Sequence, residues 1–268
     1  MSYLLRALMS TWSYRGMVRA ISERDLRARY TGSVLGPLWL ILQPLAMILI
    51  YTLVFSQVMQ ARLPGTQSGV FGYSIFICAG LISWGLFTEI SQRTKGVFLE
   101  HANLIKKVYF PKLVLLVPIV VVACFNFLVL TALYFVFLLV IDAWPGWAVL
   151  GAIPVIATLV AVALGLGLLA GVLNVFMRDV GQMIDICLQL LFWATPIVYP
   201  LAILPEPIRA VIAWNPMVAP ITQLQQIFLA GQWPDYAALA YPLALAAVLG
   251  VLALWCYRRL FSEMLDYL

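Results

Sequence analysis

The chain has 268 residues, of which 64% are hydrophobic and only 10% are charged, and its formal net charge is +5 at pH 7. Soluble domains carry about 25% charged residues, so a soluble fold of this size would leave too much apolar surface in water. The composition therefore indicates an integral membrane protein. The positive charge requires no nucleic-acid partner, because membrane lipid headgroups and cytoplasmic partners account for it.

The first element in chain order is an N-terminal segment, residues 3–22, in which apolar side chains recur at roughly helical spacing among arginines. The apolar members are Leu5, Leu8, Met9, Trp12 and Met17. This pattern predicts an amphipathic helix in the cytoplasmic interface, with a solvated arm as the alternative. The same arginines argue against a cleaved signal peptide. We assign residues 1–30 to this segment and residues 31–268 to one transmembrane domain.

Six apolar runs follow, each long enough for the about 20 residues that a helix needs to cross a bilayer. They cover residues 35–59, 70–90, 113–141, 147–174, 184–204 and 236–257. The third and fourth runs are separated only by residues 142–146, which predicts an antiparallel hairpin. The expected fold is all-α and integral to the membrane, with six transmembrane helices.

The distribution of Lys and Arg predicts the orientation of these spans. With the N-terminus inside, only Arg62 and Arg209 of the 16 basic residues fall in outside segments. The positive-inside rule then places both termini in the cytoplasm.

Residues 205–235 do not fit the pattern of a span or of a plain loop. They are apolar in pieces, and prolines at 205, 207, 216 and 220 interrupt them. Irregular backbone at membrane depth is tolerated only against protein or a water-filled cavity. We therefore expect two short re-entrant or interfacial helices on the outer side.

The spans contain few groups that would energise transport. Glu89 and Asp185 lie near cytoplasmic ends and Asp142 lies in an outside turn, whereas secondary transporters usually use buried charges. The chain also lacks a GxxxxGK[ST] phosphate-binding loop. Uphill transport would therefore draw its energy from a separate protein on the cytoplasmic face.

Residues 91–112 are the candidate dock for such a protein. A short helix there would carry one apolar stripe, flanked by Glu100, Lys106 and Lys107. The stripe consists of Phe98, His101, Leu104, Ile105 and Val108. An amphipathic helix of this kind fits a groove on a partner, although a helix resting on lipid headgroups is an alternative. The loop at 176–182 is a second candidate contact.

The cysteines and glycines have simpler interpretations. Cys78, Cys124, Cys187 and Cys256 all lie in apolar runs without the spacing of metal ligands, so we expect small buried side chains and no metal site with the lone His101. The glycines of the fourth span are expected to allow close helix packing, within the chain or between copies. They are Gly165, Gly167 and Gly171.

Five motifs, in order along almost the whole chain, resemble the permease subunits of ABC transporters that export polysaccharides, above all the O-antigen exporters. They are RDLRARYTGSVLGPLWLILQP (24–44), KKVYFPK (106–112), FMRD (176–179), WATPIVYP (193–200) and WNPM (214–217). The first is the most specific, and each of the others is weak alone.

The resemblance implies an assembly and a cargo. Two copies would pair around a channel in a bacterial inner membrane, and two copies of an ATPase subunit would bind below, holding ATP and Mg²⁺ that this chain does not bind. A coupling helix near 94–107 would seat in the ATPase, the N-terminal helix would gate the cytoplasmic entrance, and residues 205–231 would form periplasmic gate helices. The cargo would be a glycan on an undecaprenyl pyrophosphate carrier.

Physical chemistry suggests which side chains would meet such a cargo. Aromatic faces suit a sliding sugar polymer, and the channel candidates are Trp39, Tyr51, Phe55, Trp193 and Tyr199. Guanidinium groups match phosphate oxygens, so Arg24, Arg27 and Arg29 are candidates for holding the pyrophosphate. Helix packing, the interfacial aromatic belt and the positive-inside signal are the competing explanations.

Three other functions are alternatives to polysaccharide export. A permease of the same architecture would move teichoic acid or a small hydrophobic molecule. A membrane enzyme acting on the carrier lipid would need clustered catalytic carboxylates or histidines, and the loops hold only scattered ones. A structural scaffold would not explain the proline-broken outer segment. The chain is therefore expected not to be an enzyme itself.

Overall fold

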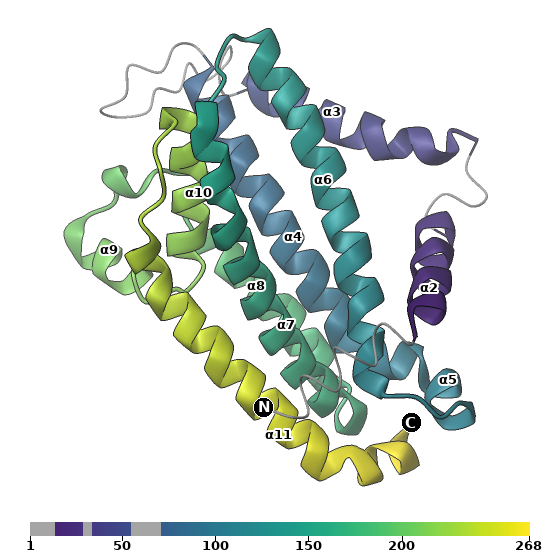
Figure 1. Cartoon of the computed structure of the whole chain (residues 1–268). Helices are drawn as coiled ribbons and strands as arrows, with labels where there is room; N and C mark the ends of the chain where they lie inside the picture. The colour runs from purple at the N-terminus through teal and green to yellow at the C-terminus, as the bar shows by residue number, and fades with distance from the viewer. Residues whose placement is uncertain (1–13, 29–33, 55–70) are drawn as a thin grey trace.

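A computed structural model of the protein describes residues 14–28, 34–54 and 71–268 (Figure 1). Within these ranges every regular element is a helix, as the sequence predicts, and no strand occurs. The α-helices are α2 (Arg15–Ala28), α3 (Trp39–Tyr51), α4 (Gly72–Glu100), α5 (Ala102–Lys107), α6 (Leu116–Val140), α7 (Ala152–Phe176), α8 (Asp179–Trp193), α9 (Glu206–Ile212), α10 (Val218–Ala230) and α11 (Ala240–Tyr267). Short 3₁₀ helices are η1 (Gly36–Leu38), η3 (Lys112–Leu115), η4 (Gly146–Gly151), η5 (Leu201–Ile203) and η6 (Tyr236–Leu239).

Four helical segments among the described residues are long and apolar enough to cross a membrane. They are Gly72–Glu100, Lys112–Val140, Gly146–Phe176 and Tyr236–Tyr267. They match the second, third, fourth and sixth expected spans, although α4 and α11 each continue about ten residues further than the apolar runs. Polar turns can extend a helix past the hydrocarbon, because each added residue still gains a backbone hydrogen bond.

The other two expected spans differ from the described helices. The run at 35–59 corresponds to the 13-residue α3. Its last residues, 55–59, lie outside the described ranges. The run at 184–204 is not one helix, because α8 ends at Trp193 and a turn follows through Pro196 and Pro200. Proline lacks the N–H that would continue a helix. The 15 residues of α8 rise only about 22 Å.

Helix α7 lies at the centre of the bundle and packs against both α4 and α11 (Figure 1). Its glycines make this possible. A Cβ on Gly165 would lie 2.9 Å from the Cβ of Leu249 on α11, and one on Gly171 would lie 2.8 Å from the carbonyl oxygen of Thr94 on α4. The expectation of close glycine packing is confirmed, and the contacts lie within the chain.

Helices α6 and α7 follow each other through a tight turn, as the hairpin prediction requires. Asp142 and Gly146 both have positive φ in this turn, at 55° and 72°. Both helices also pack against α4, which lies between them in Figure 1. The hairpin therefore straddles α4.

The proline-broken segment contains two short helices, as expected. Helix α10 inserts into the bundle against α4 and α7, and Gln225 donates a hydrogen bond of 3.0 Å to the carbonyl of Pro196. The approach to α4 is close, since a Cβ on Gly80 would lie 2.8 Å from Nε2 of Gln225. Helix α9 has no buried residues.

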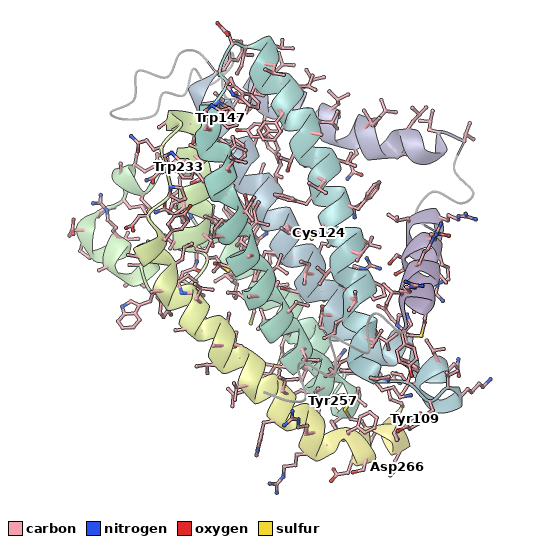
Figure 2. All side chains as sticks on the ribbon, viewed as in Figure 1. Tyr109, Cys124, Trp147, Trp233, Tyr257 and Asp266 are labelled. Carbon is pink, nitrogen blue, oxygen red and sulfur yellow. The ribbon has the colours of Figure 1, made fainter. Side chains whose placement is uncertain are left out.

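The two ends of the bundle differ in chemistry. One end, which we call the basic end, holds α5 and the last turns of α4, α7 and α11, with Arg93, Lys95, Lys106, Lys107, Arg178, Arg258 and Arg259. The other, which we call the aromatic end, exposes Trp144, Trp147, Trp214, Trp233, Tyr236 and Tyr241. Figure 2 marks Trp147 and Trp233 at the aromatic end and Tyr109 and Asp266 at the basic end.

The four cysteines differ in how far they are buried. Cys78 is buried and Cys124 and Cys256 are half-buried, but Cys187 is exposed on α8. The expectation of four buried cysteines is wrong at Cys187, because the apolar run around it lies on the outside of the bundle.

Candidate functional site

The last turns of α4 connect most of the elements of the basic end. This part of the helix carries Glu89, Gln92, Arg93 and Lys95, beyond the apolar stretch that packs in the bundle. Glu89 contacts α6, Arg93 contacts α2, and Gln92 and Lys95 both contact Asp185 of α8.

Glu89 and Arg93 connect α4 to α6 and α2. The amide of Asn126 on α6 donates to both carboxylate oxygens of Glu89, at 2.8 and 3.1 Å. The guanidinium of Arg93 pairs with Asp25 on α2 at 2.5 Å and lies 4.0 Å from Glu89. These groups are only about one-fifth exposed, so the polar contacts replace lost hydration.

Lys95 connects α4 to the first turns of α8. Its ammonium donates to the carbonyl of Gly181 at 2.8 Å and pairs with Asp185 at 2.5 Å. Asn174 closes the same turn by accepting from the N–H of Gly181 at 3.0 Å and donating to the carbonyl of Lys95 at 3.2 Å. The loop at 176–182 is therefore held against α4.

The predicted dock exists as a distinct helix, but its apolar stripe faces inward. Phe98 stacks on Tyr257 of α11 with ring centroids 5.9 Å apart, and Ile105 is buried. Leu104 packs partly buried against the same cluster. Because the core of the chain takes up Phe98, Leu104 and Ile105, most of the stripe is not available to a partner, and of its members only Val108 is exposed.

The exposed surface of the dock is the opposite side of α5 and the loop after it. Lys106, Lys107 and Val108 are exposed, and Tyr109 is fully exposed at 99% (Figure 2). Glu100 is also exposed, and His101 is half-buried with its Nδ1 3.1 Å from the carbonyl of Val97. Sequence reasoning did not find Tyr109, although its place two residues before a proline was a signal for a loop tip.

Lys112 holds this loop in shape. Its buried ammonium donates to the carbonyls of Ile105 at 2.9 Å and Val108 at 2.6 Å, and it lies 4.2 Å from the centre of the Phe110 ring. A cation at the C-terminus of a helix satisfies carbonyls that have no partner within the helix. Lys112 thereby fixes the position of Val108 and Tyr109.

The arginine candidates lie on α2 and beyond it. Arg24 is exposed and lies 3.4 Å from Asp25 and 3.5 Å from Nε2 of His101. Arg24 and Arg27 line an open cavity of about 420 Å³, together with Ala20, Glu23 and Ala28. Arg29 lies outside the described residues. A hydrogen bond from Arg19 lowers the pKa of Glu23, so this carboxylate stays charged and already has a cationic partner at 2.6 Å.

Helix α2 covers residues 15–22 of the segment predicted as an amphipathic helix and continues to Ala28. Ile21 and Ser22 are buried, and Ile21 packs in one cluster with Val97 and Phe98 of α4. Of the apolar residues expected on its face, Met17 also packs there, and the others lie outside the described residues. The apolar face of the described part thus contacts protein.

The structure brings two of the five aromatic channel candidates together. Tyr199 donates to the carbonyl of Trp193 at 2.7 Å, and Trp193 is 63% exposed at the end of α8. Trp39 is exposed on α3, whereas Tyr51 packs against Phe76 and Ile77 of α4. Phe55 lies outside the described residues.

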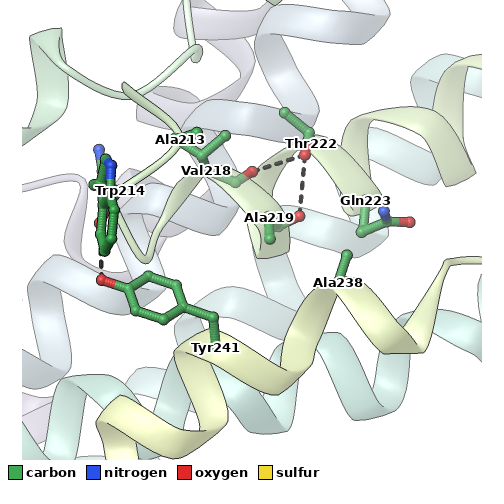
Figure 3. A pocket seen from close by; sticks show the side chains of 9 residues that line it. Ala213, Trp214, Val218, Ala219, Thr222, Gln223, Ala238 and Tyr241 are labelled. Carbon is green, nitrogen blue, oxygen red and sulfur yellow. Dashed lines mark hydrogen bonds between the residues drawn. The ribbon is translucent and has the colours of Figure 1, made fainter. Parts of the chain in front are cut away.

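The aromatic end contains a second cavity, of about 480 Å³, between α10 and the start of α11 (Figure 3). Trp214 and Tyr241 form one wall, and the Tyr241 hydroxyl donates to the carbonyl of Trp214 at 2.9 Å. Thr222 bonds the carbonyls of Val218 and Ala219 in its own helix. The polar atoms that line this cavity therefore already form hydrogen bonds, for the most part, within the chain.

The bundle has four segments that are able to cross a membrane, a basic end and a proline-broken aromatic end. This arrangement is typical of a multi-pass membrane protein such as a permease. The chain belongs to the ABC-2 type transporter family, whose model matches residues 17–229. The O-antigen export system permease protein RfbA of Myxococcus xanthus is 32% identical over 262 residues, 97% of this chain and 96% of that protein. The protein of the same name from Klebsiella pneumoniae is 31% identical over 79% of each chain. The polysialic acid transport protein KpsM of Escherichia coli is 25% identical over 92% of this chain and 95% of that protein. The resemblance inferred from the five motifs is confirmed.

Proposed function

We propose that this protein is the membrane subunit of an ATP-driven exporter that moves a polysaccharide on an undecaprenyl pyrophosphate carrier across the bacterial inner membrane. The similarity to O-antigen export permeases along 97% of the chain carries the proposal. The KpsM relative makes polysialic acid the alternative cargo. Both cargoes are long and polar, and both would require a channel wider than one chain of this size encloses.

In this proposal two copies form the channel, and the apolar surfaces of α3 and α8 meet across it. Helix α8 exposes one stripe of residues, namely Met183, Ile186, Leu190 and Trp193. Large exposed apolar surfaces mark lipid or protein contacts, and α8 is too short to span alone. The exposed stripe of α8 would rest on the partner copy.

The basic end would face the cytoplasm, following the positive-inside rule. There a separate ATPase subunit, which would bind ATP and Mg²⁺, would contact α5 through Lys106 and Tyr109 rather than through the buried stripe. Tyrosine at the tip of an ordered loop is a typical anchor of an interface. Tyr109→Ala should release the ATPase from the purified complex, whereas Tyr236→Ala at the aromatic end should not. Retention of the ATPase by Tyr109→Ala would contradict this assignment.

Arg24, Arg27 and Arg29 would bind the carrier pyrophosphate at headgroup depth. The cavity beside Arg24 and Arg27 is open and accepts an anion, because its only carboxylate is already paired with Arg19. The double variant Arg27→Ala/Arg29→Ala should lower export while the protein still inserts in the membrane. Normal export by the double variant would contradict a role of Arg27 and Arg29 in binding the pyrophosphate.

Deletion of the gene in its native host tests the whole proposal. Lipid-linked glycan should accumulate in the cytoplasm and disappear from the cell surface, and the sugar composition of the accumulated polymer identifies the cargo. Unchanged surface glycan would refute polysaccharide export, leaving an ABC-2 permease with a different cargo.

A further inference from the structure

Asp25 is out of place on the packed face of α2. The residues of this face, which include Met17, Ile21 and Ser22, lie against protein. Asp25 continues the face by one more turn, and its side chain is only 17% exposed. A carboxylate at such a position requires a partner, because burial penalises an unpaired charge.

Arg93 of α4 supplies that partner. Its Nη2 donates to Oδ2 of Asp25 at 2.5 Å, while the other oxygen of Asp25 lies 3.4 Å from the exposed Arg24. On its other side Arg93 lies 4.0 Å from Glu89, which Asn126 of α6 holds in place. The guanidinium therefore lies between the carboxylates of Asp25 and Glu89, and it donates its hydrogen bond to Asp25 on α2.

The position of Arg93 on α4 connects α2 to the dock. From Arg93 the helix runs two further turns to Glu100, and α5 begins at Ala102. Residues of α2, of the last turns of α4 and of α5 share one cluster, through Ile21, Val97 and Ile105. Figure 1 shows α2 beside α6, close to α5. Helix α2 also packs along α6, so the ion pair of Arg93 adds to these apolar contacts a direct polar link between α2 and the α4–α5 segment.

The ion pair between Arg93 and Asp25 differs from an apolar contact in what surrounds the two groups when they separate. Both partners keep about one-fifth of their side-chain surface exposed, so water can solvate them when they separate. Replacing a buried ion pair by apolar residues often leaves stability unchanged, which points to a role in specificity or switching.

We propose that Arg93 is a positioning residue for transport: through its ion pair with Asp25 it holds α2 on the end of α4, so that α2 moves with the α4–α5 segment. The expected effect on export rests on the proposed function. The coupling of α2 to α4 does not, because it is a property of the chain itself.

The variants for the test are Arg93→Met, which keeps the apolar stem, Asp25→Asn, which keeps the shape, and their double variant. Arg93→Lys retains the charge, and Glu263→Gln removes an exposed carboxylate of α11 as a matched control. Hydrogen exchange of the α2 amides is measured on the full-length protein in nanodiscs. ATP hydrolysis and export are measured with the ATPase subunit present.

Each single variant should raise exchange of the α2 amides about ten-fold, which corresponds to about 1.4 kcal/mol. The double variant should show no more than either single, because two groups that act through each other are not additive. Arg93→Lys should restore most of the protection, and Glu263→Gln should change nothing. Export per ATP hydrolysed should fall in the singles, whereas a merely structural loss would lower both activities together.

Additive effects in the double variant, or unchanged exchange in Arg93→Met, would overturn the proposal. An unchanged ratio of export to ATP hydrolysis would overturn the role in transport and leave only a structural contact. The exchange measurement needs no glycan, so failure of polysaccharide export in the deletion strain leaves it valid. Conversely, unchanged exchange together with loss of surface glycan on deletion would refute the role of Arg93 and retain the proposed function.

Discussion

Gly171 of α7 should accept a side chain poorly, because it packs directly on the backbone of α4. A Cβ there would lie 2.8 Å from the carbonyl oxygen of Thr94 and 3.5 Å from the Cα of Lys95. Both atoms belong to the backbone of α4, so no rotamer change relieves the contact. Gly85, on the same α4, is the control, because a Cβ there meets nothing within 4 Å.

The expected magnitude follows from two opposing effects. Inserting a methyl group into a packed interface costs about 1–3 kcal/mol, and alanine is about 1 kcal/mol better than glycine inside a helix. Gly85→Ala gains the second effect without the first, so the two variants should differ by about 1–3 kcal/mol. For a chain of this size that is roughly 2–12 °C in Tm.

Thermal unfolding of the purified variants in one detergent measures this difference. Gly171→Ala should unfold at a lower temperature than Gly85→Ala, by several degrees. Equal melting temperatures for the two variants would refute the close approach of α4 and α7, and with it the route by which Lys95 reaches Gly181.

Two further predictions concern the ends of the bundle. Lys112→Met should leave the carbonyls of Ile105 and Val108 without their donor and raise hydrogen exchange in the loop after α5, whereas Lys112→Arg should keep most of the protection; equal exchange in wild type and Lys112→Met would contradict the capping role. Asn215 donates to Thr195 at 2.9 Å and accepts from the N–H of Met217 at 2.9 Å, so Asn215→Leu should destabilise the turn before α10 by about 1–3 kcal/mol, seen as faster proteolysis there; unchanged cleavage would count against it.

Much of the architecture followed from the sequence because lipid imposes a simple rule. Backbone polar groups in hydrocarbon must be satisfied within a helix, so runs of apolar residues predicted four helices that the structure describes. The prolines between residues 205 and 220 predicted α9 and α10 for the related reason that proline ends helices. The glycines of α7 predicted close packing, because only a missing side chain permits it.

The candidate site was harder to predict because helix faces are assigned by packing and not by composition. Phe98 and Ile105 form a stripe that would suit a partner equally well, but the core of the same chain occupies it. The exposed Tyr109 carries no periodic signal. In the fifth apolar run, Pro196 and Pro200 were the sign that the helix would end early, but the residues around them are apolar enough to predict a span, whereas α8 ends at Trp193.

By itself, the sequence determined that this protein belongs in lipid, its helical class, its proline-broken segment and its family, because these depend on composition and on local rules for the backbone. Only the tertiary structure decided which residues meet. Arg93 finds Asp25 and Lys95 finds Asp185 across 68 and 90 positions of the chain, pairings that depend on how α2, α4 and α8 are placed. A charge at one position is compatible with many partners until packing selects one.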